Sequence, residues 1–399
     1  MKHLSFPRLF CIGLIGSAFM ASAPAQAVQS SVGQFDIQDY DTVTSTWSWA
    51  QPPSDHHRLF LDVYNVTDFF DSETGGVAGF TDQTLLADTI RPMVTVLWDD
   101  RFRIQLGLIA EKAYGDPVGY KSVDPWIQLL WQPIQPLSVV FGNLDTPHYY
   151  LPALFYPTNY FMQETNEAGM QLILKKPFLY DDFYYNYRLM DTSAHNEKFD
   201  LGFVHRNNWK WLSLNYQSHW IHEGGQLNPH TFNTRNDVAQ TFGVGLQFHP
   251  IHSLMIGGSY NRLNSHLRQD ADGAAYQINS RTGTGHLFQA YARWGRVKLI
   301  FGDWRGHQFF HEGGDPMFTL PNMNLLTARW DILLSHDFNL FAETTGYFIG
   351  NNDLGYDRYI KAAFHIQAAW QFSVPIMEWT SPAASPEGEP LPARWDYGI

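Results

Sequence analysis

The sequence predicts an all-β fold, a transmembrane antiparallel up-and-down β-barrel of about 16 strands. Three observations predict it. Apolar and polar residues alternate in one segment after another, most clearly in residues 101–110, where every even-numbered position is apolar and Arg103 and Gln105 lie between them. Beyond the N-terminal region, no stretch is apolar throughout the roughly 18 residues that a membrane helix needs. Tight turns alternate with longer connections, as in outer-membrane barrels.

A period of two indicates a strand whose two faces meet different solvents. Sixteen segments show this period. They cover residues 57–66, 90–98, 102–112, 125–132, 136–143, 167–175, 180–189, 198–206, 209–221, 237–248, 253–265, 284–294, 296–306, 322–334, 338–349 and 358–372. The tight turns are expected at residues 99–100, 133–136, 207–208, 250–252, 295 and 335–337. An even strand number places both ends of the barrel on the side of the short turns, which is the periplasmic side.

The N-terminus has the features of a secretory signal peptide over residues 1–27. Lys2 lies in a positively charged start, residues 9–19 are apolar, and a small-x-small cleavage site ends at Ala27. The single cysteine, Cys11, lies inside this segment. The mature chain is therefore expected to have neither a disulfide nor a thiol nucleophile.

The chain is acidic, with a formal net charge of -13. Removing the two positive residues of the signal peptide changes this to about -13 - 2 = -15. Such a charge argues against nucleic acid as a partner.

Two segments flank the predicted barrel at residues 57–372. Residues 28–56 are polar and are expected to form a periplasmic leader, a plug or an additional strand. Residues 373–399 are rich in proline, which favours an extended periplasmic tail. This tail is either an idle linker, a partial plug, or a segment that docks a periplasmic partner.

The last predicted strand carries apolar side chains on one face, namely Phe364, Ile366, Trp370 and Phe372. This pattern resembles the aromatic-ended signal that bacterial outer-membrane proteins present to their insertion machinery, although those proteins usually end at that aromatic residue. Residues 57–372 as a whole resemble Gram-negative outer-membrane β-barrels of general-porin size. More faintly, the aromatic and amide content resembles channels that export exopolysaccharide. The resemblance implies the outer membrane as location and its lipid as partner.

The third long connection, residues 144–166, is unusually apolar for a loop in water. In general porins the third long loop folds into the barrel and narrows it. By this resemblance, an aromatic constriction is expected from Tyr149, Tyr150, Phe155, Tyr156, Tyr160 and Phe161. The alternative is that the loop packs on the barrel rim or against another subunit.

Strand parity predicts which side chains point into the lumen. Those expected along the substrate path are Arg103, Glu111, Arg188, His219, Arg329, Asp331 and Glu343. Their charges are mixed, whereas a strongly ion-selective pore carries a ring of one sign. The lining suits neutral polar solutes such as saccharides, unless these groups only pair with one another in a wet lumen.

The tetrapeptide His-Glu-Gly-Gly occurs twice, at residues 222–225 and 311–314. Its glycines suit turns that need positive φ. One His and one Glu from each copy would bind a metal if the two loops met. Without a fixed ligand spacing, turn chemistry is the favoured interpretation, and the spacings of His219 with His222 and of His307 with His311 are equally weak signals. No metal or cofactor is therefore expected.

The sequence thus predicts a passive outer-membrane channel for polar solutes, with saccharide or exported polysaccharide as cargo, and not an enzyme. No Gly-x-Ser-x-Gly motif is present, and sixteen strands enclose an aqueous channel. Two alternatives remain. One is a non-conducting anchor or assembly protein that binds a partner, and the other is a lipid- or lipopolysaccharide-modifying enzyme with its site at the rim.

Overall fold

The structure is a computed structural model of the 399-residue chain. It describes residues 56–380 except 74–81, 100, 116–118, 121, 135, 146–147, 149, 156–165, 177, 193–194, 225–231, 252, 272–276, 335–337 and 350–358. The predicted signal peptide, N-terminal leader and most of the predicted tail lie outside these residues, and so do Tyr149, Tyr156, Tyr160 and Phe161.

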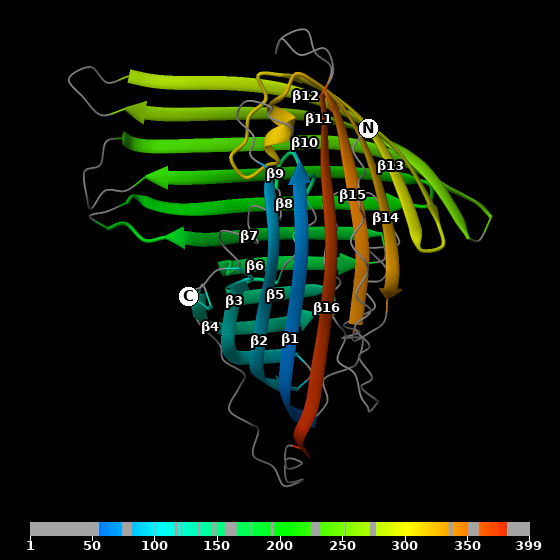
Figure 1. The fold of residues 1–399 in the computed structure, drawn as a ribbon. Coiled ribbons are helices and arrows are strands. Elements are labelled where there is room, and N and C mark those ends of the chain that lie inside the picture. Colours follow the sequence, from blue (N-terminus) through cyan, green and yellow to red (C-terminus); the bar gives the residue numbers. More distant parts are fainter. Residues whose placement is uncertain are drawn as a thin grey trace.

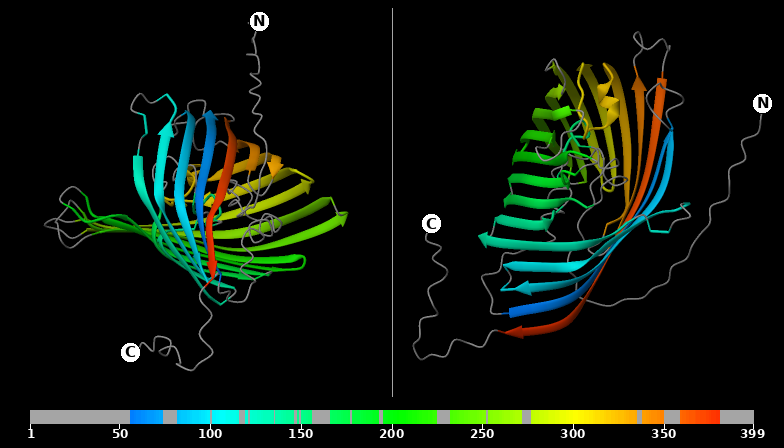
Figure 2. Two further views of the ribbon diagram at one scale, coloured as in Figure 1. Left: turned by 90° about the horizontal axis from the view of Figure 1, so that it is seen from below. Right: turned by 90° about the vertical axis from the view of Figure 1, so that its left-hand side faces the viewer.

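Sixteen antiparallel strands form a closed barrel in which β1 pairs with both β2 and β16 (Figures 1 and 2). The strands are β1 (His56–Glu73), β2 (Gln83–Trp98), β3 (Phe102–Ala113), β4 (Ser122–Ile134), β5 (Leu137–Asn143), β6 (Ala168–Lys176), β7 (Leu179–Leu189), β8 (Glu197–Trp209), β9 (Leu212–Gly224), β10 (Phe232–Ile251), β11 (Leu254–Ala271), β12 (Gln277–Trp294), β13 (Val297–His307), β14 (Asn322–Leu334), β15 (Phe338–Ile349) and β16 (Tyr359–Thr380). A short 3-10 helix, η1 (Pro316–Thr319), lies in the connection between β13 and β14. We call the end with the short turns the turn end, and the opposite end the loop end.

The predicted fold class is confirmed, and each predicted strand corresponds to an observed one. The differences lie mainly at the loop end, where β1 continues to Glu73 and β10 to β12 are 20, 18 and 18 residues long. There both faces of the wall carry polar residues, so the hydrophobic alternation fades while the hydrogen-bonded ladder continues. At the other end, β16 runs to Thr380, so the predicted boundary at Phe372 falls inside a strand.

One predicted turn is wrong. Asn207 and Asn208 pair with Leu214 and Ser213 of β9, so the ladder continues past them. The chain reverses at Lys210, which has a φ of 55°. Local composition favoured the asparagines, but the register of β8 against β9 decided the position of the turn.

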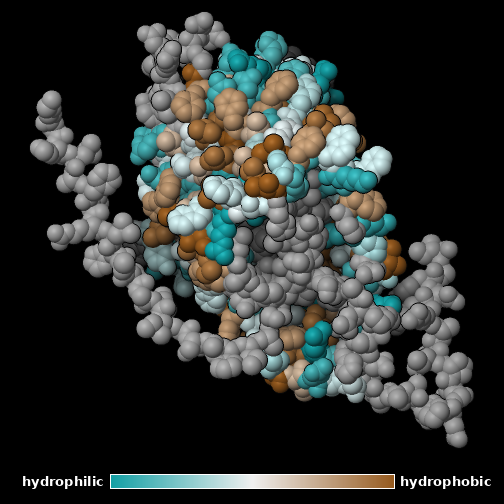
Figure 3. Space-filling model, turned by 90° about the vertical axis from the view of Figure 1, so that its right-hand side faces the viewer, coloured by the Kyte–Doolittle hydropathy of each residue, from teal (hydrophilic) through white to brown (hydrophobic). Residues whose placement is uncertain are grey.

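The two faces of the wall have opposite character. On β3, Leu106 and Leu108 are 52% and 48% exposed on the outside, whereas Arg103 is 3% exposed on the inside. At the turn end the outside carries exposed tryptophans, among them Trp98, Trp294 and Trp330, as expected for an aromatic girdle. Figure 3 shows apolar side chains over a broad part of one outer face and hydrophilic ones toward its upper edge. The protein is an outer-membrane β-barrel in contact with membrane lipid.

No helix in the described part of the chain has the length and apolarity needed to cross a membrane.

Candidate functional site

Two loops fold into the barrel from the loop end and meet there. The third loop (residues 144–167) contributes Leu151, Ala153 and Leu154, all at most 1% exposed. The seventh loop (residues 308–321) contributes η1, and the backbone N–H of Asp315 donates to the carbonyl oxygen of Pro152 at 2.7 Å. The predicted insertion of the third loop is thus seen in its described residues, with a second loop packed against it.

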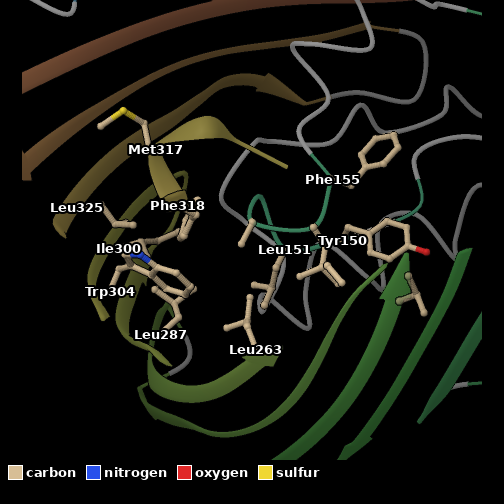
Figure 4. Close-up of a cluster of buried hydrophobic side chains, with 14 of the residues drawn as sticks. Tyr150, Leu151, Phe155, Leu263, Leu287, Ile300, Trp304, Met317, Phe318 and Leu325 are labelled. Atoms are coloured by element: carbon tan, nitrogen blue, oxygen red, sulfur yellow. The ribbon is translucent and has the colours of Figure 1, made fainter. Parts of the chain in front are cut away.

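The packing between these loops and the wall is tight (Figure 4). Trp304 on β13 is fully buried, contacts Phe309 and Phe318 edge-on with ring centroids 5.4 and 5.1 Å apart, and donates from Nε1 to the carbonyl oxygen of Leu320 at 2.8 Å. Gly285 on β12 faces the same ring, and a Cβ there would lie 1.9 Å from it. The loop end of the lumen therefore contains a hydrophobic core.

His148 lies beside this core. Its Nδ1 donates to Asp182 at 2.8 Å, its Nε2 donates to Glu167 at 3.1 Å, and its ring stacks on Tyr184 with centroids 3.8 Å apart. Burial lowers the pKa of His148, but the attraction of Glu167 and Asp182 outweighs this and raises it to about 10. Both ring nitrogens therefore carry protons near neutral pH. His148 fixes the third loop to the wall and has no lone pair with which to act as a base.

A buried pair of histidines ties the seventh loop to the wall. Nδ1 of His219 lies 2.9 Å from Nε2 of His311, and Nδ1 of His311 lies 3.0 Å from a carboxylate oxygen of Asp237. The side chains of both histidines are 0% exposed, and Asp237 is 1% exposed. The chain Asp237–His311–His219 resembles a proton relay, but the described loops seal it from lipid and water.

The two His-Glu-Gly-Gly copies approach each other through their glutamates. Arg235 of β10 lies 2.8 Å from Glu312 and 3.8 Å from Glu223, and Lys198 lies 2.5 Å from Glu312. His222 of the first copy contacts Asn236 at 2.9 Å, whereas His311 of the second copy contacts His219 and Asp237. In the described part of the chain, no group of three or more His, Cys, Asp or Glu side chains is arranged to hold a metal.

The predicted path residues fall into two separate groups. Near the turn end, Nη2 of Arg103 donates to Gln128 at 2.6 Å, and Nε of Arg329 donates to Asp331 at 2.7 Å opposite Glu343 on β15. Near the loop end are His219, Glu111 and Arg188, the last paired with Asp200 at 3.3 Å. Of the predicted aromatic constriction, the described residues Tyr150 and Phe155 are buried. A single constriction formed by all of these residues stays a prediction.

The outer surface carries polar groups where lipid is expected. On β13 the outward positions Val297, Leu299 and Phe301 are apolar, and the next two are Asp303 and Arg305. Nη2 and Nε of Arg305 contact Asp303 at 2.9 and 3.2 Å. Strand geometry places Asp303 about 15 Å from the turn end, in the outer half of an apolar band about 25 Å tall, and Arg305 about 20 Å from it, toward the outer border. Ionised groups facing lipid are costly, so their presence there indicates a function.

His286 on β12 is the neighbour of this pair. It lies between Arg305 and Arg262, its register partners on β13 and β11. Its Nδ1 is 2.7 Å from the hydroxyl of Tyr260, and the two rings stack with centroids 6.0 Å apart. We call His286, Tyr260, Asp303 and Arg305 the lipid-facing histidine site.

A second outward polar group lies on the opposite part of the wall. Asn65 and Thr67 of β1 donate to one carboxylate oxygen of Asp88 on β2, at 2.8 and 2.7 Å. Lys112 on β3 is the register partner of Asp88. This group holds a carboxylate at the same border but has no histidine.

The lipid A 3′-O-deacylase-type family matches residues 51–345, most of the chain. The protein belongs to this family. The expectation that it is not an enzyme is therefore wrong, because the family is named for removing an acyl chain from lipid A. The absence of a Gly-x-Ser-x-Gly motif was weak evidence against an enzyme, because an ester can also be hydrolysed by an activated water without a serine nucleophile.

Solved structures with similar folds are porins at low identity. A substituted porin of Rhodopseudomonas blastica is 12% identical with a TM-score of 0.43, and OmpT of Vibrio cholerae is 12% identical with a TM-score of 0.44. OccAB3 of Acinetobacter baumannii is 10% identical with a TM-score of 0.46. Each match covers 79% of this chain and 99–100% of the other. No curated protein matches the chain.

No member of the lipid-facing histidine site was predicted from the sequence, because functional side chains were expected to point into the lumen. A signal was present. In a deacylase of this family the substrate lies in the membrane, so the informative residues are polar ones at outward parity. Asp303 and Arg305 follow three apolar outward residues on the same strand and break the pattern.

Proposed function

We propose that this deacylase-family protein hydrolyses an acyl ester of an outer-leaflet glycolipid at the lipid-facing histidine site. The observation that carries the proposal is His286, fixed by Tyr260 at 2.7 Å and placed between two arginines at the border of the apolar band. The ester bonds of a membrane lipid lie at this border, between the acyl chains and the headgroup.

Location favours this site over the buried histidines. A lipid reaches the outer wall by diffusing in the bilayer, whereas His148, His219 and His311 have fully buried side chains inside the barrel. His286 is half-buried on the outside, beside the exposed Phe288. The proposed reaction therefore needs no path through the lumen.

The reaction is an ordinary ester hydrolysis. Nε2 of His286 accepts a proton from water as the water oxygen bonds to the ester carbonyl carbon. The carbonyl oxygen becomes an oxyanion, which an N–H group of Arg305 stabilises. The carbon–oxygen bond to the sugar then breaks, the sugar oxygen takes the proton from His286, and a fatty acid and a glycolipid hydroxyl are released.

The neighbours of His286 support these roles. For Nε2 to act as a base, Nδ1 must carry the proton and donate it to the hydroxyl oxygen of Tyr260, which fixes the ring orientation. Arg305 is held by Asp303 and donates from Nη1 to Asn322 at 3.2 Å. These contacts orient the guanidinium before substrate binds, which is what oxyanion stabilisation requires.

The test uses the mature chain in proteoliposomes that contain lipid A, with released fatty acid and glycolipid mass as readouts. His286→Gln is expected to lower the rate at least ~100-fold, the range for loss of a general base. Tyr260→Phe is expected to lower it less, because the base remains and only its orientation loosens. Two controls, His219→Gln in the lumen and Asp88→Asn in the rival outward group, are expected to keep the rate.

Loss of activity in Asp88→Asn with full activity in His286→Gln would move the site to β1 and β2. No hydrolysis by the unaltered protein would reject the proposed reaction.

A channel for polar solutes is a second candidate. The polar lining near the turn end favours it, where Arg103 and Gln128 on one wall and Arg329 and Asp331 on another carry mixed charge. Saccharide as cargo stays a prediction. Single-channel conductance of the mature chain, compared with a variant lacking Tyr149–Tyr160, tests it: steps that grow on deletion and that oligosaccharides block would support the channel.

A further inference from the structure

The barrel wall is uneven in height, and β10 to β12 form one of its long parts, as β1 and β16 do elsewhere. β10, β11 and β12 have 20, 18 and 18 residues, whereas β5, β6 and β13 have 7, 9 and 11 (Figure 1). On β11 the apolar outward positions end before Arg262, and the strand continues to Ala271. Nine residues of a tilted strand span about 20 Å, so this part stands above the apolar band, at the level of lipid headgroups.

The outside of this raised part is polar, and its acidic side chain on β11 is Asp270 at the rim. On β11 the outward residues are Arg262, Asn264, His266 and Arg268, and on β12 they include Thr282 and Thr284. All but Thr284, which is half-buried, are exposed. We call these six residues the outer wall. In a chain with a net charge of -13, the six residues of the outer wall carry two arginines and a histidine, and Asp270 lies beyond them at the rim.

The two arginines of the outer wall, Arg262 and Arg268, differ in whether an acidic side chain compensates their charge. Arg268 contacts Asp270 at the rim at 3.1 Å, which partly compensates its charge. Arg262 makes no ion pair within the described part of the chain, and it lies directly beside His286 in the register. The uncompensated positive charge of the outer wall therefore lies at Arg262, directly beside the lipid-facing histidine site.

We propose that the outer wall docks the phosphorylated sugar headgroup of the outer-leaflet glycolipid. This inference rests on the proposed function and names the part of the substrate that the wall recognises. Arginine is suited to phosphate because its N–H groups match the phosphate oxygens in pairs. The hydroxyl and amide groups of Thr282, Thr284 and Asn264 provide donors and acceptors for sugar hydroxyls. A lipid held there would have its acyl esters below the headgroup, next to His286.

A soluble headgroup probe separates docking from hydrolysis, because it carries no acyl chain. We would titrate the full mature chain in detergent with an acyl-free bisphosphorylated glucosamine disaccharide, and in parallel with the same disaccharide lacking phosphates. The double variant R262Q/R268Q is expected to bind the phosphorylated probe at least ~10-fold more weakly, the usual scale for lost charge-assisted contacts. The control Lys112→Gln removes a cation at the same border on the other side of the barrel and is expected to bind normally.

Several results would overturn the inference. Equal affinity for the two probes would show that phosphate is not recognised, and unchanged affinity in the double variant would place any binding elsewhere. A change in oligomeric state of the double variant with unchanged probe affinity would make the outer wall an interface between copies of the chain. If the protein bound the phosphorylated probe but hydrolysed no lipid, the proposed docking surface would be supported and only the proposed reaction would be rejected.

Discussion

Two histidine groups on the same barrel differ in what surrounds them. His219 and His311 lie inside, 2.9 Å apart, with side chains that are 0% exposed. His286 lies outside, 2.7 Å from the Tyr260 hydroxyl, half-buried at the border of the lipid. Hydrogen bonding is similar in both, so it does not by itself identify a reactive histidine. A reactive histidine must also be accessible to the membrane lipid that would be its substrate.

The same contrast holds for charged residues. Inside, Asp237 accepts from the backbone N–H of Glu312 at 2.8 Å and contacts His311, so it holds a loop in place. Outside, Asp303 contacts Arg305 and has outward parity on β13. A buried carboxylate with several donors contributes to structure, whereas a carboxylate kept against lipid indicates a role in binding or reaction. Three predictions test this division, from the largest expected effect to the smallest.

The inner core is expected to be far more sensitive to truncation than the outer face. Trp304→Ala removes a fully buried ring and the donor to Leu320, and is expected to lower the free energy of unfolding by about 3–5 kcal/mol. The matched control Phe301→Ala, on the lipid side of the same strand, is expected to cost less because lipid chains fill the space. Urea unfolding in lipid vesicles measures both. Equal losses would contradict a packed core between the loops.

The third loop is expected to loosen at high pH. Because the pKa of His148 is raised to about 10, its ion pairs are fully formed below its unfolded pKa near 6.5. Their contribution is lost as pH rises through about 10. Protease cleavage within residues 144–155 should therefore increase between pH 8 and roughly pH 11. His148→Gln should show high cleavage at all of these pH values, and a pH-independent pattern in the unaltered chain would argue against the ion pairs.

The ion pairs of Glu312 at the rim are expected to contribute least to the free energy of unfolding. Glu312→Gln removes the contacts to Lys198 and Arg235, whose side chains are 14% and 25% exposed. The expected loss is about 0.2–1 kcal/mol in urea unfolding, and it should shrink at 1 M salt because screening weakens exposed pairs. A loss above that of Trp304→Ala would mean that this cluster, and not the hydrophobic core, holds the seventh loop.

Much of the barrel was predictable from local sequence. Strands β14 and β15 were predicted at their observed bounds, and the outward parity of residues 102–108 was correct. The reason is that a membrane strand must expose apolar side chains on one face every two residues, which leaves a local signal in the chain. The ends of β10 to β12 were missed, because that signal stops where the wall leaves the lipid.

The sequence by itself determined the fold class, the strand number and the membrane setting, since each follows from a pattern within a few neighbouring residues. Only the tertiary structure decided which distant residues meet. Loops 144–167 and 308–321 pack together inside the lumen through contacts such as Asp315 with Pro152. Tyr260, His286 and Arg305 come together because the registers of β11, β12 and β13 align them. Register and loop packing depend on pairing between remote segments, for which a single sequence carries no local pattern.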